Sequence, residues 1–117
     1  MALRISEKES DGIVTLELTG RVVLGDESGQ LRAKIKDLLA KGKTRLILDL
    51  ANVSYIDSAG LGALVAGFTS AQSQGANMKL AHLTTKFHEQ LHITKLVTIF
   101  EVYDTAADAA KSFQAAP

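Results

Sequence analysis

A run of branched apolar residues leads into the start of a helix in the middle of the chain, and this junction limits the folds that the chain can adopt. The apolar run, residues 45–50, is typical of a strand buried inside a sheet. A short turn is expected after it, and then a helix over residues 58–74, because Asp57 and Ser58 are both favourable N-cap residues. A buried strand that leads into a helix predicts a sheet covered by helices.

The first turn of this helix contains two glycines, Gly60 and Gly62. Each costs roughly 1 kcal/mol relative to alanine inside a helix, so helix capping alone does not account for them. A small, polar helix start with a serine at its tip suits close approach by a ligand or by another protein. The rest of the helix has one apolar face, made of Leu61, Leu64, Val65, Phe68 and Ala71.

Strands and helices alternate on both sides of this junction. Two short strands are expected at residues 3–9 and 13–19, joined by the turn Ser10-Asp11-Gly12 and followed by a loop over residues 20–29. The other expected elements are a helix capped by Ser28 and ended by Lys41-Gly42-Lys43, a strand at 78–83, a short helix capped by Thr84 or Thr85 that runs through Leu91, a strand at 97–102 and a helix at 105–114. The predicted fold is a single α/β domain, with a mixed sheet of four to five strands and about four helices packed against it.

Composition narrows the classes of function. The chain has 117 residues, 46% of them hydrophobic, which suits one globular domain. Lys plus Arg and Asp plus Glu both number 13, so no basic excess exists to bind nucleic acid or an anionic membrane. There is no cysteine, no signal-peptide pattern and no apolar run long enough to span a bilayer. We therefore expect a soluble cytoplasmic domain.

The hexapeptide Asp57-Ser58-Ala59-Gly60-Leu61-Gly62, placed after a strand, resembles the most recognisable motif of the STAS domain family, the anti-sigma factor antagonists of bacteria. The likeness covers most of the chain. Leu16-Glu17-Leu18-Thr19-Gly20 resembles the second strand of the family, Lys79-Leu80-Ala81 the strand after the long helix, and residues 87–100 the short helix and last strand. The resemblance implies that residues 1–117 form one STAS domain.

This resemblance also implies a regulatory binding protein, not an enzyme, with no cofactor and no metal. The unmodified form would bind an anti-sigma factor that is also a serine kinase and so release a sigma factor. Ser58 would be the phosphorylation site, and a PP2C-type serine phosphatase would reset it. The implied partner-binding residues are Asp57, Ser58, Ala59, Gly60, Leu61 and Gly62, together with Arg21 and Val23 from the loop that normally flanks the partner surface.

The chemistry of the helix start is compatible with that role. A phosphate at a helix N-terminus meets free backbone N–H groups and the positive end of the helix dipole. It would add a charge of about −1.5 to −2 beside Asp57, so the fold should survive modification while the surface changes sign.

One part of the chain departs from the family pattern. Many members have Gly-Glu-Leu-Asp after the second strand, whereas this chain has Gly20-Arg21-Val22-Val23. The identity of the partner therefore stays open. The alternative is a STAS module of another assembly, either stressosome-like or transporter-associated.

Residues 88–92 match the zinc-peptidase motif H-E-x-x-H, in which two histidines on one helix face hold zinc and the glutamate activates water. No third ligand follows at the usual spacing, since the nearest later acid is Glu101. The remaining histidine, His82, is the other candidate ligand. A short surface helix that carries two histidines by chance is the favoured interpretation.

Two further patterns suggest phosphate chemistry. Asp49, at the expected end of a hydrophobic strand, resembles the phosphate acceptor of response-regulator receivers, but two strands precede the first helix and no acidic pair follows the first strand. Gly60 and Gly62 resemble part of a phosphate-binding loop, but no Gly-Lys-Ser/Thr follows them. Both interpretations rank below the binding module.

Overall fold

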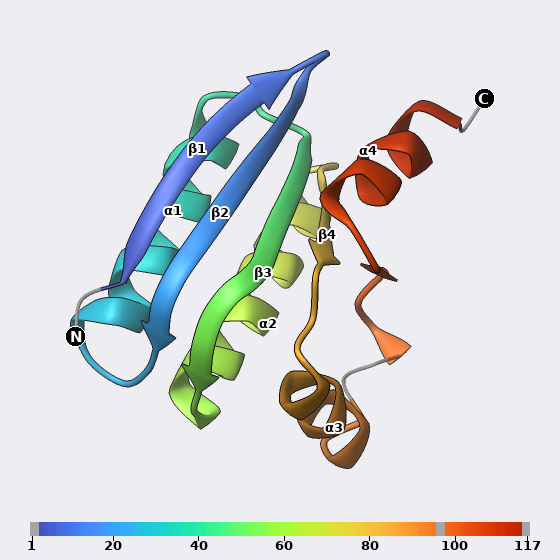
Figure 1. Ribbon diagram of the computed structural model, residues 1–117. Coiled ribbons are helices and arrows are strands. Elements are labelled where there is room, and N and C mark those ends of the chain that lie inside the picture. Colours follow the sequence, from blue (N-terminus) through green and yellow to red (C-terminus); the bar gives the residue numbers. More distant parts are fainter. Residues whose placement is uncertain (1–2, 96–97, 116–117) are drawn as a thin grey trace.

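A computed structural model describes residues 3–95 and 98–115, which form one five-stranded sheet with helices packed against it (Figure 1). The strands lie in the order β1-β2-β3-β4-β5; β1 is antiparallel to β2, and the other neighbours are parallel. This arrangement confirms the predicted mixed α/β fold. The elements are β1 (Arg4–Ser10), β2 (Ile13–Val22), α1 (Asp26–Ala40), β3 (Arg45–Ile56), α2 (Ser58–Ser73), β4 (Asn77–Ala81), α3 (Thr85–Ile93), β5 (Val102–Tyr103) and α4 (Ala106–Ala115).

The opening hairpin forms where the sequence predicts it. Asp11 and Gly12 have φ angles of 55° and 77°, and Ser10 pairs with Ile13. Two consecutive residues with positive φ make the two-residue turn that matches the twist of a hairpin. The antiparallel pair therefore precedes the parallel part of the sheet.

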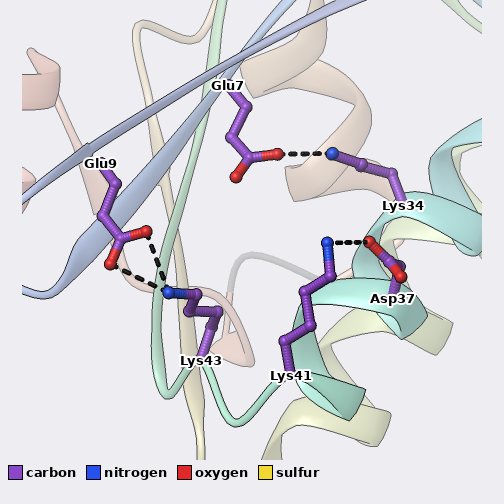
Figure 2. A network of polar contacts seen from close by, with 6 residues as sticks. All are labelled: Glu7, Glu9, Lys34, Asp37, Lys41 and Lys43. Atoms are coloured by element: carbon purple, nitrogen blue, oxygen red, sulfur yellow. Dashed lines mark hydrogen bonds and ion pairs between the residues drawn. The ribbon is translucent and has the colours of Figure 1, made fainter.

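The edge strand β1 is exposed, and charged side chains tie it to its neighbours (Figure 2). Glu7 pairs with Lys34 of α1, and Glu9 accepts hydrogen bonds of 3.0 and 3.1 Å from Lys43, just before β3. The hydrogen bond from Lys34 holds the pKa of the Glu7 carboxyl below its ordinary value. Charges along an edge strand disfavour pairing with a second chain.

The main core lies between the sheet and helices α1 and α2. On β3, Leu48 is fully buried, and the predicted apolar face of α2 packs on this core. Leu61 and Leu64 are buried, whereas Val65 and Phe68 are partly buried. These positions confirm the helical pattern of α2 that the sequence predicts.

The opposite face of the sheet carries a smaller core under α4. Ile47 lies between Leu46 and Leu48 on β3, so its side chain points away from the main core and packs with Ala109 of α4. Beside this cluster, Lys79 is buried, and its ammonium donates to Ser112 Oγ at 2.6 Å. The helix α4 is thus held by apolar contacts and by a hydrogen bond from the buried Lys79.

The two central strands are longer than the sequence predicts. β2 continues to Val22 and β3 to Ile56, and these two residues pair with each other. The predicted turn after residue 50 is therefore wrong, and Asp49 lies inside β3 instead of at its end. Two register shifts along β2 break the apolar alternation, so the second half of each strand resembles a loop in the sequence.

The longer β2 shortens the predicted loop and moves the start of the next helix. α1 begins at Asp26 after Gly25, which makes no side-chain cap. Ser28, predicted to be the cap, lies buried inside the first turn, where its hydroxyl donates to the Gly25 carbonyl at 3.3 Å. The predicted N-cap is wrong.

The last predicted strand is also largely wrong. Only Val102 and Tyr103 pair with β4, while residues 98–100 form a short turn of 3₁₀ type and a bend. Val97, part of the predicted strand, lies outside the described residues. Phe100 is buried with its ring centre 5.3 Å from that of Phe68, so the apolar residues of this segment enter the core without forming a ladder.

The remaining boundaries agree with the predictions to within about two residues. Thr84 caps α3, its hydroxyl accepting from the Phe87 N–H at 3.2 Å. Across the described part of the chain, none of the helices has the length and apolar character needed to cross a bilayer.

Candidate functional site

The start of α2 lies at the end of the molecule where β2 and β3 terminate (Figure 1). Asp57 caps the helix, with Oδ1 accepting from the Gly60 N–H at 2.8 Å. Its other oxygen, Oδ2, accepts from the Leu24 N–H at 3.0 Å. These hydrogen bonds from Gly60 and Leu24 favour the ionised carboxylate and hold the pKa of Asp57 below its ordinary value. One carboxylate therefore fixes both the helix start and the loop between β2 and α1.

The predicted hexapeptide separates into exposed and buried positions. Ser58 is exposed as the first residue of α2, while Ala59 and Gly62 are half-buried. Gly60 and Leu61 are buried. Ser58 is therefore the residue of this segment whose side chain is open to a partner.

The two glycines of the motif have different physical roles. A Cβ atom at Gly60 would lie 2.0 Å from the backbone oxygen of Val22, a distance that no side chain can accommodate. A Cβ atom at Gly62 would lie 3.8 Å from Arg32 Nη2, which is ordinary van der Waals contact. Close packing of α2 on β2 thus accounts for Gly60, and no such packing accounts for Gly62.

The two predicted residues outside the motif, Arg21 and Val23, lie beside this helix start. Arg21 is exposed near the end of β2, and its guanidinium carbon lies 5.5 Å from the centre of the Tyr55 ring. Val23 is half-buried, and its carbonyl accepts from the Ser28 N–H at 3.1 Å. Arg21 is available at the surface, whereas Val23 mainly holds the loop.

Sequence reasoning missed three surface residues at this end of the molecule. Leu24 is 77% exposed and Tyr55 is 40% exposed. The ammonium of Lys86, on α3, lies 5.5 Å from the centre of the Tyr55 ring. No periodic pattern joins these residues, because they come from a loop, a strand and a helix.

The H-E-x-x-H motif occupies α3, where His88 and His92 are both exposed. The third histidine, His82, lies 3.9 Å from Asp49, measured from Nε2 to Oδ2. Within residues 3–95 and 98–115, no three side chains able to bind a metal gather in one place. The motif therefore brings no metal-binding cluster together in that part of the chain.

The concave surface beside the helix start is small. A cavity of about 20 Å³ lies between β3 and α3, bordered among others by Tyr55, Lys86 and Gln90. That volume holds roughly one water molecule. The Gly60 N–H, which a phosphate-binding loop would offer to its ligand, already donates to Asp57 at 2.8 Å. A partner would meet a shallow surface here, which suits a protein better than a small molecule.

The family model described as the STAS domain matches residues 4–109. The chain belongs to the STAS domain family. BtrV of Bordetella bronchiseptica, named as a candidate anti-sigma factor antagonist, is 28% identical over 97% of both chains. The anti-sigma-B factor antagonist of Bacillus subtilis is 28% identical over 87% of this STAS chain and 92% of its own.

Solved structures agree with this assignment. A candidate anti-sigma factor antagonist of Thermotoga maritima, tm1081, has a TM-score of 0.86 and 28% identity, with 92% of each chain covered. More distant STAS-like structures share the fold alone. They include the antagonist SpoIIAA in its unphosphorylated form, at 18% identity, and a sulfate transporter family protein of Wolinella succinogenes, at 20% identity, with TM-scores of 0.74 and 0.75. The curated relatives are named as anti-sigma factor antagonists, which are regulatory proteins. This STAS domain is accordingly a regulatory module, not an enzyme.

Proposed function

We propose that this STAS domain is an anti-sigma factor antagonist switched by phosphorylation of Ser58. The observation that carries the proposal is the exposed Ser58 hydroxyl at the start of α2, beside a capping aspartate that fixes the surrounding backbone. The names of the curated relatives support the general role. In the cytoplasm, the unmodified domain would bind an anti-sigma factor with serine kinase activity and so release a sigma factor.

The domain supplies the acceptor for the phosphate, and the partner supplies the phosphoryl-transfer machinery. The kinase transfers the γ-phosphoryl group of ATP to Ser58 Oγ, and a PP2C-type serine phosphatase hydrolyses the phosphoester to restore the hydroxyl. At the start of α2 the phosphate is stabilised by the helix dipole, so its cost to the fold is small. Its charge of about −1.5 to −2 changes the surface that the partner meets.

Phosphorylation and binding with purified proteins test this proposal. The wild-type chain and Ser58→Ala are incubated with Mg-ATP and each anti-sigma factor kinase encoded in the same genome. Mass spectrometry locates any phosphate, and calorimetry measures binding. One kinase should modify wild type at Ser58, leave Ser58→Ala unmodified and bind both unmodified proteins. Phosphate at another residue, or no binding to any such kinase, would overturn the proposal.

A second candidate is a STAS module in a larger assembly, either stressosome-like or transporter-associated. Two observations favour keeping it: the Gly20-Arg21-Val22-Val23 segment departs from the usual family pattern, and the fold also occurs in a sulfate transporter family protein. This candidate predicts a stable complex with another STAS protein or a transporter, and no release of a sigma factor from any kinase.

A further inference from the structure

Two large apolar side chains are exposed at the end of the molecule that carries Ser58. Leu24 and Tyr55 are 77% and 40% exposed, whereas most large apolar residues of the described chain are buried. Both lie close to Asp57: Leu24 through the hydrogen bond from its N–H, and Tyr55 two positions earlier in the chain. Large apolar side chains that stay exposed beside a candidate site are candidates for contact with a protein partner.

Two cations accompany Tyr55. Arg21 from β2 and Lys86 from α3 each place their charge 5.5 Å from the centre of its ring. Neither forms an ion pair with another described residue. The cations near β1 differ, because Lys34 and Lys43 there are each paired with a glutamate (Figure 2).

The nearby carboxylate of Asp57 forms no ion pair with either cation within the described residues. Both oxygens of Asp57 accept hydrogen bonds from backbone N–H groups. The residues that border the adjacent cavity include Lys86 and no acid. The exposed Tyr55 ring is therefore flanked by two cations that form no ion pair with an acid in the described part of the chain.

We propose that Arg21, Leu24, Tyr55 and Lys86 form a docking surface for a partner segment that presents a carboxylate next to an apolar side chain. The carboxylate would lie against the two cations, and the apolar side chain against Leu24 and Tyr55. The inference rests on the proposed function, since it assigns that segment to the kinase partner. The cavity of about 20 Å³ is too small for a ligand with this chemistry, so the segment lies across the surface.

This docking surface also explains how phosphorylation could act. A phosphate on Ser58 would place its negative charge close to Tyr55, three positions earlier in the chain. It would repel the carboxylate of the partner and compete with it for the cations. The switch would then act by charge at the docking surface and would need no change of fold.

The first test uses a probe that does not depend on the kinase. Hexaglutamate is titrated into the isotope-labelled full chain and followed by NMR, with hexalysine at the same ionic strength as the comparison. We expect hexaglutamate alone to shift the amide signals of Arg21, Tyr55 and Lys86 in a saturable way. Arg21→Glu and Lys86→Glu should abolish these shifts. The control Lys111→Glu, an exposed site on α4, should keep them.

The second test uses the kinase that binds wild type. Arg21→Glu and Lys86→Glu should each weaken binding on the order of tenfold, and the loss should shrink at high salt. Lys111→Glu should bind as wild type does. Thermal melts verify that each variant is folded.

The outcomes separate the two proposals. If the kinase binds but the charge reversals change nothing, or if hexaglutamate shifts no signal at these residues, the docking surface is overturned and the proposed function stands. If no kinase binds while hexaglutamate is recognised at these residues, the proposed function is overturned and an acidic partner of another kind uses the surface. Binding of anionic lipid vesicles through Arg21 and Lys86, without recognition of hexaglutamate, also overturns the inference.

Discussion

The carboxylate of Asp57 accepts a hydrogen bond from the Leu24 N–H at 3.0 Å, across 33 positions of sequence. The same carboxylate caps α2 through Gly60. This shared acceptor ties the backbone at Leu24 to the start of α2, the helix whose first residue is Ser58. One side chain therefore joins the loop between β2 and α1 to the start of α2.

Replacing Asp57 with asparagine should loosen the loop and spare the helix. Asparagine caps helices about as well as aspartate, but its amide keeps only one accepting oxygen. Amide hydrogen exchange at Leu24 should therefore become faster in Asp57→Asn, while exchange in the middle of α2 stays unchanged. The matched control is Asp104→Asn, at an exposed aspartate that makes no hydrogen bond within the described residues. Equal exchange at Leu24 in wild type and Asp57→Asn would contradict the prediction.

Asp57 should also make stability depend on pH in the acid range. Because its pKa is lower in the folded chain than in the unfolded chain, its contribution is fully present above the ordinary value of about 3.9. The contribution is lost as the pH falls through the lower pKa of the folded state. Denaturant unfolding should show wild type and Asp57→Ala furthest apart at neutral pH and converging below about pH 4. A gap that stays constant down to pH 2 would exclude this linkage.

The two glycines of the motif should respond in opposite directions to alanine. Gly60→Ala places a methyl group against the backbone of Val22 and should cost about 1–3 kcal/mol or more. Gly62→Ala meets only the tip of Arg32 and should gain up to about 1 kcal/mol from helix propensity. Chemical denaturation measures both free energies of unfolding. Equal costs at the two positions would mean that α2 does not pack on β2 as described.

Ser58→Asp should leave the fold intact and change binding. An acidic residue at the start of a helix is favourable by about 0.3–1 kcal/mol, so the melting temperature should not fall. Binding to the kinase should weaken, though less than with phosphoserine, because aspartate carries one charge and lacks the tetrahedral oxygens. Calorimetry compares wild type, Ser58→Ala, Ser58→Asp and the phosphorylated protein. If Ser58→Asp and the phosphorylated protein both bind as tightly as wild type, Ser58 is only part of the helix start.

A pair of leucines tests the core. Leu48→Ala removes a fully buried side chain from β3 and should cost about 2–5 kcal/mol. Leu24→Ala, at a position that is 77% exposed, should change the free energy of unfolding by less than about 0.5 kcal/mol. A loss of less than about 1 kcal/mol in the free energy of unfolding of Leu48→Ala would mean that this side chain of β3 does not point into the main core.

The purified protein should carry no stoichiometric zinc. His88 and His92 are exposed on α3, and the described residues bring no third ligand to them. Elemental analysis after purification without chelator tests this prediction. One zinc ion per chain that disappears in His88→Ala would contradict it.

The sequence by itself determined the local elements. Three kinds of local signal can be recognised from the sequence because each depends on residues that are close together in the chain. They are the Asp11-Gly12 turn, the helix caps Asp57 and Thr84, and the apolar face of α2. The order of the strands and helices follows from these signals, and so does the family resemblance carried by the α2 start.

Only the tertiary structure decided the length of β3, the reason for Gly60 and the composition of the docking surface. β3 continues to Ile56 because β2 lies beside it, and Gly60 is required because the Val22 backbone lies against it. Arg21, Tyr55 and Lys86 meet because the ends of β2 and β3 lie next to the start of α3. Contacts between residues far apart in the chain produce no periodic pattern in the sequence, because each contact depends on where two separate segments pack in the fold.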